Sequence, residues 1–193
     1  MRKSLFAMTL GSLILAGCAT TPETRVTRFH LNQPIAPGDI AVEPLAGADR
    51  GSPEFQTYAS IVGNELARLG FREAPGLAKS EQVAVVQVDR SFFDGPPRSA
   101  FSIGIGGGSY GYRGGVGGGV SVPIQGRPSQ NVATRLVVQI KRRSDSSTIW
   151  EGKAETAQRF GAPGSQPADA VAKLAAALFR GFPGESGRTI TVK

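Results

Sequence analysis

The sequence predicts an α+β domain, in which an antiparallel sheet of about four to five strands has two helices packed on one face. Two segments, 53–69 and 167–180, carry apolar residues at helical spacing. Several other segments alternate apolar and polar residues, as half-buried strands do. Helices with one apolar stripe and strands with one apolar side bury these surfaces against each other. A glycine-rich hairpin insert is predicted in addition.

Residues 1–17 have the pattern of an export signal. Two basic residues are followed by a short apolar run from Leu5 to Leu15 and by two small residues before Cys18. The run is about half the length that spans a bilayer, so we expect no transmembrane anchor. In residue type and order the segment resembles a bacterial lipoprotein signal, whose cysteine thiol receives a diacylglycerol and becomes the new N-terminus. The alternative is an ordinary secretory signal with an incidental cysteine.

Cleavage before Cys18 leaves 193 − 17 = 176 residues. We expect residues 18–24 to be a lipidated tether and 25–193 to be a single domain, since this length supports one core. Cys18 is the only cysteine, which excludes a disulfide within the chain. No acidic residue follows it directly, which in the Gram-negative lipoproteins that this chain resembles favours the outer membrane, on its periplasmic face.

The net charge of +7 becomes +5 when the two basic residues of the signal are removed. In an exported chain this excess indicates anionic head groups, cell-wall polymer or protein neighbours, so we expect no nucleic-acid partner. The alternative is that the charge only aids solubility. We expect the membrane to be a partner through the N-terminal lipid, and the oligomeric state is not predicted.

The domain begins with two short predicted strands. Residues 25–31 alternate weakly, and prolines at 34 and 37 end the segment. Residues 39–45 form the second strand, with Ile40 and Val42 on one face.

The first helix has clear signals at both ends. Ser52 is placed to cap it, and Pro53 occupies the first helical position. Gly70 is predicted to end the helix in the left-handed conformation, with Phe71 packing back on Leu66. The apolar stripe, at steps of four and three, consists of Phe55, Ala59, Val62, Leu66 and Leu69. We expect this stripe to lie in the core.

Three longer strands and a second helix follow. The strands are predicted over 80–90, 131–141 and 148–156, the last two as a hairpin whose basic end is Lys141, Arg142 and Arg143. The helix begins at Pro167 and is predicted to end, like the first, at a glycine followed by a phenylalanine. Residues 189–192 are a candidate edge strand.

Residues 101–124 are the glycine-rich insert. Ten of the sixteen residues from Gly104 to Gly119 are glycine, and apolar residues alternate on both flanks. This pattern predicts two strands with one apolar side, joined by a flexible tip. The residues that we expect to contact a partner are Phe101, Ile103, Tyr110, Tyr112, Val120 and Val122. The alternative is a low-complexity loop without function.

No catalytic or metal site is predicted. The glycine run fits G-x-G-x-x-G and G-x-S-x-G around Ser109, but it has no surrounding dinucleotide unit and no downstream acid and histidine. The only histidine, His30, lies upstream in a predicted strand, and one histidine with one cysteine leaves no metal ligand set. We therefore expect no cofactor and no enzymatic activity, an exported hydrolase being the weakest alternative.

Taken together, these features resemble the lipoproteins of the "domain of unknown function 4136" family. The residues that carry the resemblance are Leu69-Gly70-Phe71 at the first helix exit and Trp150-Glu151-Gly152, interpreted as a turn. The resemblance covers about 25–182, although this chain lacks an aspartate-rich opening to its first strand. It implies an α+β envelope domain and supplies no catalytic residues.

Two functions are consistent with these features. The first is a non-enzymatic outer-membrane lipoprotein, facing the periplasm, that supports envelope assembly or integrity through contacts with an envelope protein. The alternative is a binding module for lipid, lipopolysaccharide or cell-wall fragments that uses the insert and the basic hairpin end. A pocket lined by Phe101, Ile103 and Val122 would favour the binding module, and a flat exposed apolar hairpin would favour protein contact.

Overall fold

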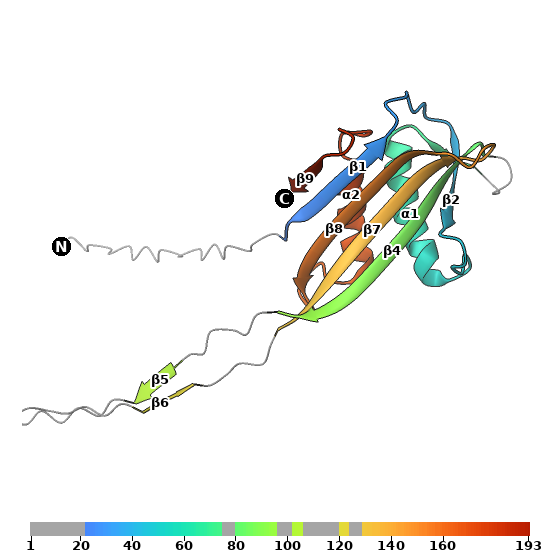
Figure 1. The fold of residues 1–193 in the computed structure, drawn as a ribbon. Helices are drawn as coiled ribbons and strands as arrows, with labels where there is room; N and C mark the ends of the chain where they lie inside the picture. The colour runs from blue at the N-terminus through green and yellow to red at the C-terminus, as the bar shows by residue number, and fades with distance from the viewer. Residues whose placement is uncertain (1–21, 75–79, 96–101, 106–119, 124–128) are drawn as a thin grey trace, which may run out of the picture.

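The computed structural model describes residues 22–74, 80–95, 102–105, 120–123 and 129–193, and Figure 1 shows their arrangement. A seven-stranded sheet in the order β3-β2-β4-β7-β8-β1-β9 has two helices on one face. Its strands are β1 (Thr24–His30), β2 (Asp39–Pro44), β3 (Arg72–Glu73), β4 (Gln82–Asp94), β7 (Gln130–Arg142), β8 (Thr148–Arg159) and β9 (Thr189–Val192). The helices are α1 (Pro53–Arg68) and α2 (Pro167–Phe179). In the described part of the chain, neither helix is long and apolar enough to cross a membrane.

The predicted sheet was wrong in both strand number and pairing. The sheet of the structure has seven strands instead of the predicted four to five. It is mixed instead of antiparallel, because β2 pairs in parallel with β3 and with β4. The helix α1 lies between β2 and β4 in the chain, so it acts as a crossover that brings the chain back to the same end of the sheet. The antiparallel sheet was predicted from strands with one apolar side, a pattern that does not determine the direction of a strand. The strand β3 was missed because two residues are too few to give an alternating pattern. The candidate edge strand is confirmed as β9, which pairs with β1.

The core lies between the sheet and the two helices. Alternation along the long strands directs one set of side chains toward the helices, and these are fully buried. The largest of the buried side chains are Trp150, Ile40, Leu66, Leu136, Ile140, Leu174 and Leu178. The predicted apolar faces of both helices and of the long hairpin are therefore confirmed.

The two ends of α1 are formed as predicted. The Ser52 hydroxyl accepts a hydrogen bond from the backbone N–H of Phe55 at 3.1 Å. At the other end Gly70 has φ +91°, and the N–H of Phe71 donates to the carbonyl of Leu66 at 3.1 Å. This pattern is a Schellman motif, in which the left-handed glycine lets the chain turn back and satisfy the last carbonyls.

The end of α2 differs from the prediction. Gly181 has φ +67°, but the preceding Arg180 is already extended, at φ −60° and ψ 117°. The N–H of Phe182 donates to the carbonyl of Phe179 at 3.1 Å, so the four residues form a type II turn. The glycine therefore serves the turn after the helix, and the last helical carbonyls need another donor.

That donor is the buried side chain of Arg28, on β1. Its Nε donates to the carbonyl of Leu178 at 2.9 Å, and its Nη2 donates to those of Ala177 and Arg180 at 3.1 and 3.0 Å. The side chain is 5% exposed, and burial lowers the pKa of the guanidinium. Because a helix C-terminus carries partial negative charge, it stabilises the buried cation without a carboxylate. Arg28 thus caps α2.

The strand predicted over 148–156 is confirmed as β8, and the interpretation of Trp150-Glu151-Gly152 inside it as a turn is wrong. The Trp150 ring is buried, stacks on Phe179 with ring centroids 5.6 Å apart, and donates from Nε1 to the carbonyl of Pro183 at 3.0 Å. A Cβ atom on Gly152 would overlap this ring and lie 2.7 Å from Cδ1 of Leu178. The glycine is therefore required by the close approach of the indole.

Candidate functional site: the open face of the sheet

Of the predicted site residues, the structure describes Ile103, Val120 and Val122 of the insert, and these only by their backbone. Strands β5 (Ser102–Ile105) and β6 (Val120–Pro123) pair antiparallel as a separate two-stranded sheet, with Ile103 opposite Val122. Two strands flanking the glycine run are thus confirmed. The remaining predicted residues, Cys18, Phe101, Tyr110 and Tyr112, lie outside the described residues. The prediction that a pocket would favour a binding module and a flat apolar hairpin would favour protein contact is therefore not tested.

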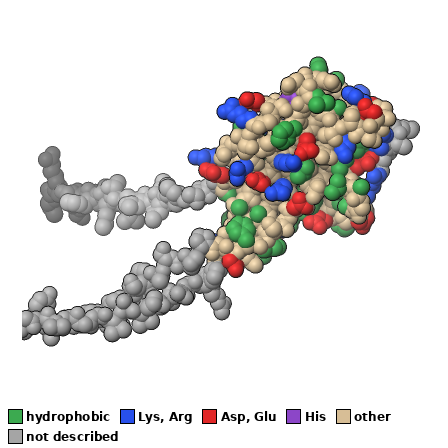
Figure 2. Space-filling view, viewed as in Figure 1, with side chains coloured by type: hydrophobic (Ala, Val, Ile, Leu, Met, Phe, Trp, Pro, Cys, Tyr) green, Lys and Arg blue, Asp and Glu red, His purple; other side chains and the backbone are tan. Residues whose placement is uncertain are grey.

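The described domain offers a different surface, the face of the sheet opposite the helices, which we call the open face. Figure 2 shows this side, where basic and acidic side chains are interspersed. Its central part is a groove of about 520 Å³ between side chains of β4, β7, β8 and β1. The residues that line it are Arg25, Thr27, Gln87, Asp89, Arg135, Val137, Gln139, Glu151, Lys153 and Glu155.

One row of the open face crosses four strands with charges of alternating sign. The register places Asp89 opposite Arg135, Arg135 opposite Glu155, and Glu155 opposite Arg25. The Glu155 carboxylate lies 3.4 Å from the Arg135 guanidinium and 3.7 Å from that of Arg25. The Arg135 and Glu155 side chains are 57% and 44% exposed, so water screens both pairs.

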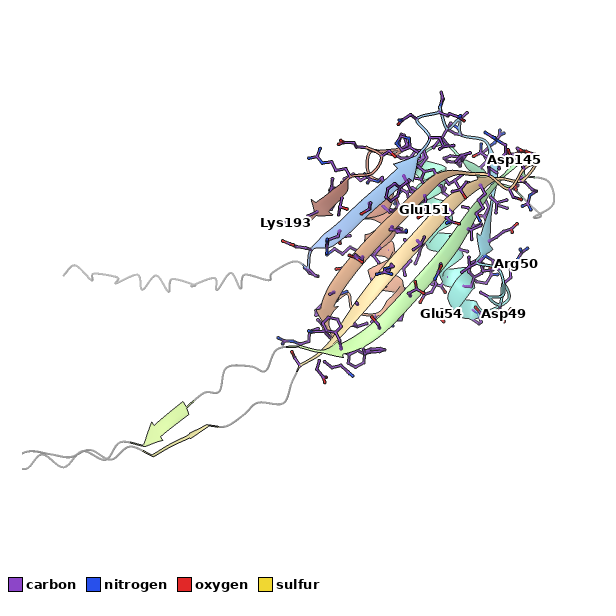
Figure 3. All side chains as sticks on the ribbon, in the orientation of Figure 1. Asp49, Arg50, Glu54, Asp145, Glu151 and Lys193 are labelled. Atoms are coloured by element: carbon purple, nitrogen blue, oxygen red, sulfur yellow. The ribbon has the colours of Figure 1, made fainter. Side chains whose placement is uncertain are left out.

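A second cluster lies nearer the start of β8, around Glu151, which is labelled in Figure 3. Lys153 Nζ lies 2.9 Å from one oxygen of Glu151, and Gln139 Nε2 donates to the other at 2.8 Å. The hydrogen bond from Lys153 lowers the pKa of the Glu151 carboxyl, and the bond from Gln139 lowers it further. Glu151 therefore stays ionised at neutral pH and is not suited to donate a proton.

The charged groups of the open face pair with one another in ion pairs and one amide hydrogen bond. In the part of the chain that the structure describes, no three histidine, cysteine or carboxylate side chains gather to hold a metal ion. The histidine His30 lies apart from the groove. Its Nε2 bonds to the carbonyl of Gly184 at 3.0 Å, and its Nδ1 accepts from the N–H of Asn32 at 3.2 Å. The imidazole thus joins β1 to the segment after α2.

A second exposed feature, which we call the aromatic end, consists of Phe92, Phe93 and Phe160, where β4 and β8 finish. These side chains are 53%, 45% and 55% exposed. The rings of Phe92 and Phe160 meet edge to face at 5.6 Å, on the helix side of the sheet. On the open side Phe93 contributes, with Ala133 and Ala157, to a hollow of about 400 Å³. The sequence interpretation ended this strand at residue 90 and so missed the Phe92-Phe93 pair.

The basic hairpin end is engaged in bonds within the domain. Arg143 donates to the Glu43 carboxylate at 2.8 Å and to the carbonyl of Ser80 at 2.9 Å. Arg142 lies 3.3 Å from Asp145, which Figure 3 labels at the turn. Two of the three charges assigned to a ligand-binding patch therefore join the hairpin to its own neighbours.

Comparison with known proteins gives a family match over most of the domain. Residues 42–184 match the family described as "Domain of unknown function (DUF4136)". An uncharacterised protein from Zymomonas mobilis is 33% identical over 217 residues, covering 91% of this chain and 82% of that protein. A PelC dodecamer from Paraburkholderia phytofirmans aligns at TM-score 0.44 and 14% identity, covering 80% of this chain and 93% of that one. A PDZ domain protein from Parabacteroides distasonis aligns at TM-score 0.49 and 10% identity, covering 89% of this chain and 39% of that one.

Proposed function

This chain belongs to the DUF4136 family, and we propose that it is a non-enzymatic lipoprotein held in the outer membrane through Cys18. In this proposal the domain faces the periplasm and supports envelope assembly or integrity by contact with a protein partner. The site of contact is the open face of the sheet. No cofactor is involved.

The observation that carries the proposal is the charged row from Asp89 to Arg25. Exposed ion pairs of this kind contribute about 0–1 kcal/mol each to stability, so the fold does not depend on them. Alternating charges across four strands nevertheless form a defined pattern that a complementary protein surface can recognise. Complementary charge chiefly determines the rate and the specificity of association. The groove of about 520 Å³ gives such a partner a concave surface to fill.

A binding module for lipid, lipopolysaccharide or cell-wall fragments is the second candidate. The observation in its favour is the hollow beside Phe93, whose apolar wall comes from Ala133 and Ala157. Small-molecule sites combine such apolar walls with a few polar groups, and Arg25 and Glu155 border this one. The ion pairs of Arg142 and Arg143 reduce the support for the basic hairpin end as its ligand patch.

Photo-crosslinking in intact cells tests the protein-contact proposal. A photoreactive residue replaces Gln87 or Val137 on the open face, and in a matched control it replaces Asn64, which is exposed on α1. We expect discrete protein adducts from the two open-face positions and none from position 64. Adducts of equal strength from all three positions, or from none, would contradict a contact on the open face.

A charge exchange makes this test specific. Arg135→Glu places three acidic side chains in one row, whereas Arg135→Glu with Glu155→Arg restores the pair in reverse order. We expect both variants to fold, because each pair is exposed, and both to lose the adducts from position 87. Retention of the adducts in both variants would show that the row does not recognise the partner.

Lipidation is tested separately by the mass of the mature protein. We expect wild type to lack residues 1–17 and to carry a diacylglycerol on Cys18, and Cys18→Ser to keep its signal. Two or more acyl chains hold a protein at a membrane almost irreversibly, at about 0.8 kcal/mol per buried CH₂. A mature protein without added lipid mass would refute the lipoprotein assignment and leave the open-face test unaffected.

A further inference from the structure

Four strand termini meet at one end of the sheet. Thr24, where β1 begins, lies opposite Thr156 near the end of β8, and Asp94 at the end of β4 lies opposite Gln130 at the start of β7. The register also places Asn131 opposite Arg159. The chain from Cys18 and both connections to the insert therefore join the domain at this same end (Figure 1).

The aromatic end lies beyond the point at which the tether joins. From Thr156, opposite Thr24, β8 and the residue after it run four residues to Phe160, which is about 13 Å at the rise of a strand. The tether runs six residues from Cys18 to Thr24, and its reach is at most about 20 Å. A lipid on Cys18 therefore holds the bilayer surface close to the aromatic end when the tether continues the line of β1 outward from Thr24.

The three rings encircle this end of the sheet instead of forming a patch on one face. Phe92 and Phe160 lie on the helix side and Phe93 on the open side, all about half exposed. Arg90 lies over the Phe92 ring, with its guanidinium carbon 5.9 Å from the centroid, and donates to the carbonyl of Ser165 at 2.8 Å. A single chain segment would cover one side of such an end, whereas the interfacial layer of a membrane surrounds all three rings.

We propose that the aromatic end enters the interfacial layer of the membrane that holds the Cys18 lipid. This inference depends on the lipidation proposed above, and it assigns an orientation to the domain. In this orientation the strands run roughly along the membrane normal. The open face is then exposed to the periplasm, where a protein partner can reach it. Amphipathic helices bury their apolar face about 5–10 Å into the boundary between head groups and acyl chains, and the three rings with Arg90 beside them present the same combination of apolar and basic groups.

Quenching of introduced tryptophans by brominated lipids tests the orientation. Lipidated mature protein, residues 18–193, is purified as Phe93→Trp, Phe160→Trp and Leu31→Trp, and is placed in vesicles of phosphatidylethanolamine, phosphatidylglycerol and dibrominated phosphatidylcholine. Leu31 is the matched control, because it is 66% exposed and follows the opposite end of β1. The native Trp150 is buried and gives a constant background. Thermal melts of the three variants confirm that each is folded.

We expect fluorescence from positions 93 and 160 to fall about twofold in brominated vesicles, and that from position 31 to stay unchanged, because only the aromatic end enters the head-group layer. Protein that floats with the vesicles but shows no quenching at 93 and 160 would overturn the inference and leave the lipoprotein assignment intact. Equal quenching at position 31 would overturn the upright orientation.

Two further outcomes separate the sources of failure. Emission from position 160 that is blue-shifted before vesicles are added, and not quenched afterwards, would show that the aromatic end is already buried in the free protein and would overturn the inference. Protein that neither floats nor carries lipid mass on Cys18 would refute the lipidation on which the inference depends.

Discussion

Replacement of Arg28 by methionine tests the strongest polar feature of the core. Methionine keeps much of the length of the side chain and removes all three hydrogen bonds to the carbonyls at the end of α2. Hydrogen bonds to a charged group contribute about 1.5–3 kcal/mol each, and buried acceptors without a donor carry their full desolvation penalty. Relief of the buried charge offsets part of this loss. We expect the free energy of unfolding to fall by about 3 kcal/mol.

Urea denaturation followed by circular dichroism measures this change. With a slope of about 2 kcal/mol per molar urea, a loss of about 3 kcal/mol lowers the midpoint by about 1.5 M. Arg25→Met is the matched control, since this arginine is three residues away on β1, 66% exposed, and 3.7 Å from its partner Glu155. We expect the control to change stability by less than about 1 kcal/mol.

Arg28→Lys adds an internal comparison. An ammonium group keeps the charge but does not have the planar fork that reaches three separate carbonyls. Its stability should therefore lie between those of wild type and Arg28→Met. Equal midpoints for Arg28→Met and Arg25→Met would refute the assignment of Arg28 as the cap of α2.

Three further predictions concern stability. Gly152→Ala should lower the free energy of unfolding by about 1–3 kcal/mol, seen in the same urea titration, because its methyl group overlaps the indole ring. Gly70→Val places a β-branched residue at φ +91° and should lower it by about 1–2 kcal/mol; an unchanged melting temperature would contradict this. Burial, with a hydrogen bond to Glu54, raises the pKa of Tyr58 from 10.0 to about 12. As the pH rises, the phenol of Tyr58 loses its proton in the unfolded chain before it does so in the folded one. Its contribution to the free energy of unfolding is therefore fully present below pH 10 and is lost as the pH rises toward 12. In an alkaline titration, Tyr58→Phe should lose less stability than wild type.

The features that the sequence predicted correctly depend on neighbouring residues. The cap at Ser52 and the left-handed exit at Gly70 are defined within a few positions of each other. The buried faces of the helices and of the long hairpin follow from local periodicity. Each of these signals is complete within about four helical turns or one strand, so no knowledge of the fold is needed to interpret it.

The features that the sequence did not predict depend on distant residues. Arg28 contacts a helix end that lies 150 positions later in the chain, and an arginine in a weakly alternating strand gives no local sign of its acceptors. The parallel pairing of β2 with β4 depends on the path of α1 between them. Trp150 and Gly152 look like a turn in the sequence because glycine is common in turns, whereas here the glycine makes room for a ring.

The open face could be predicted in part, because its composition depends on neighbouring residues and its charge pairs depend on distant ones. Alternation along the two strands of the predicted hairpin puts Arg135 and Gln139 on the polar side of the first strand, and Glu151 and Glu155 on the polar side of the second. Only the register, with its shift between Ile140 and Lys141, brings Arg135 opposite Glu155 and Gln139 opposite Glu151. Because these pairs are exposed, each contributes about 0–1 kcal/mol to stability, so their order of charge can be reversed while the domain stays folded. A change in crosslinking after that reversal therefore reports on recognition of a partner, separately from any effect on the fold.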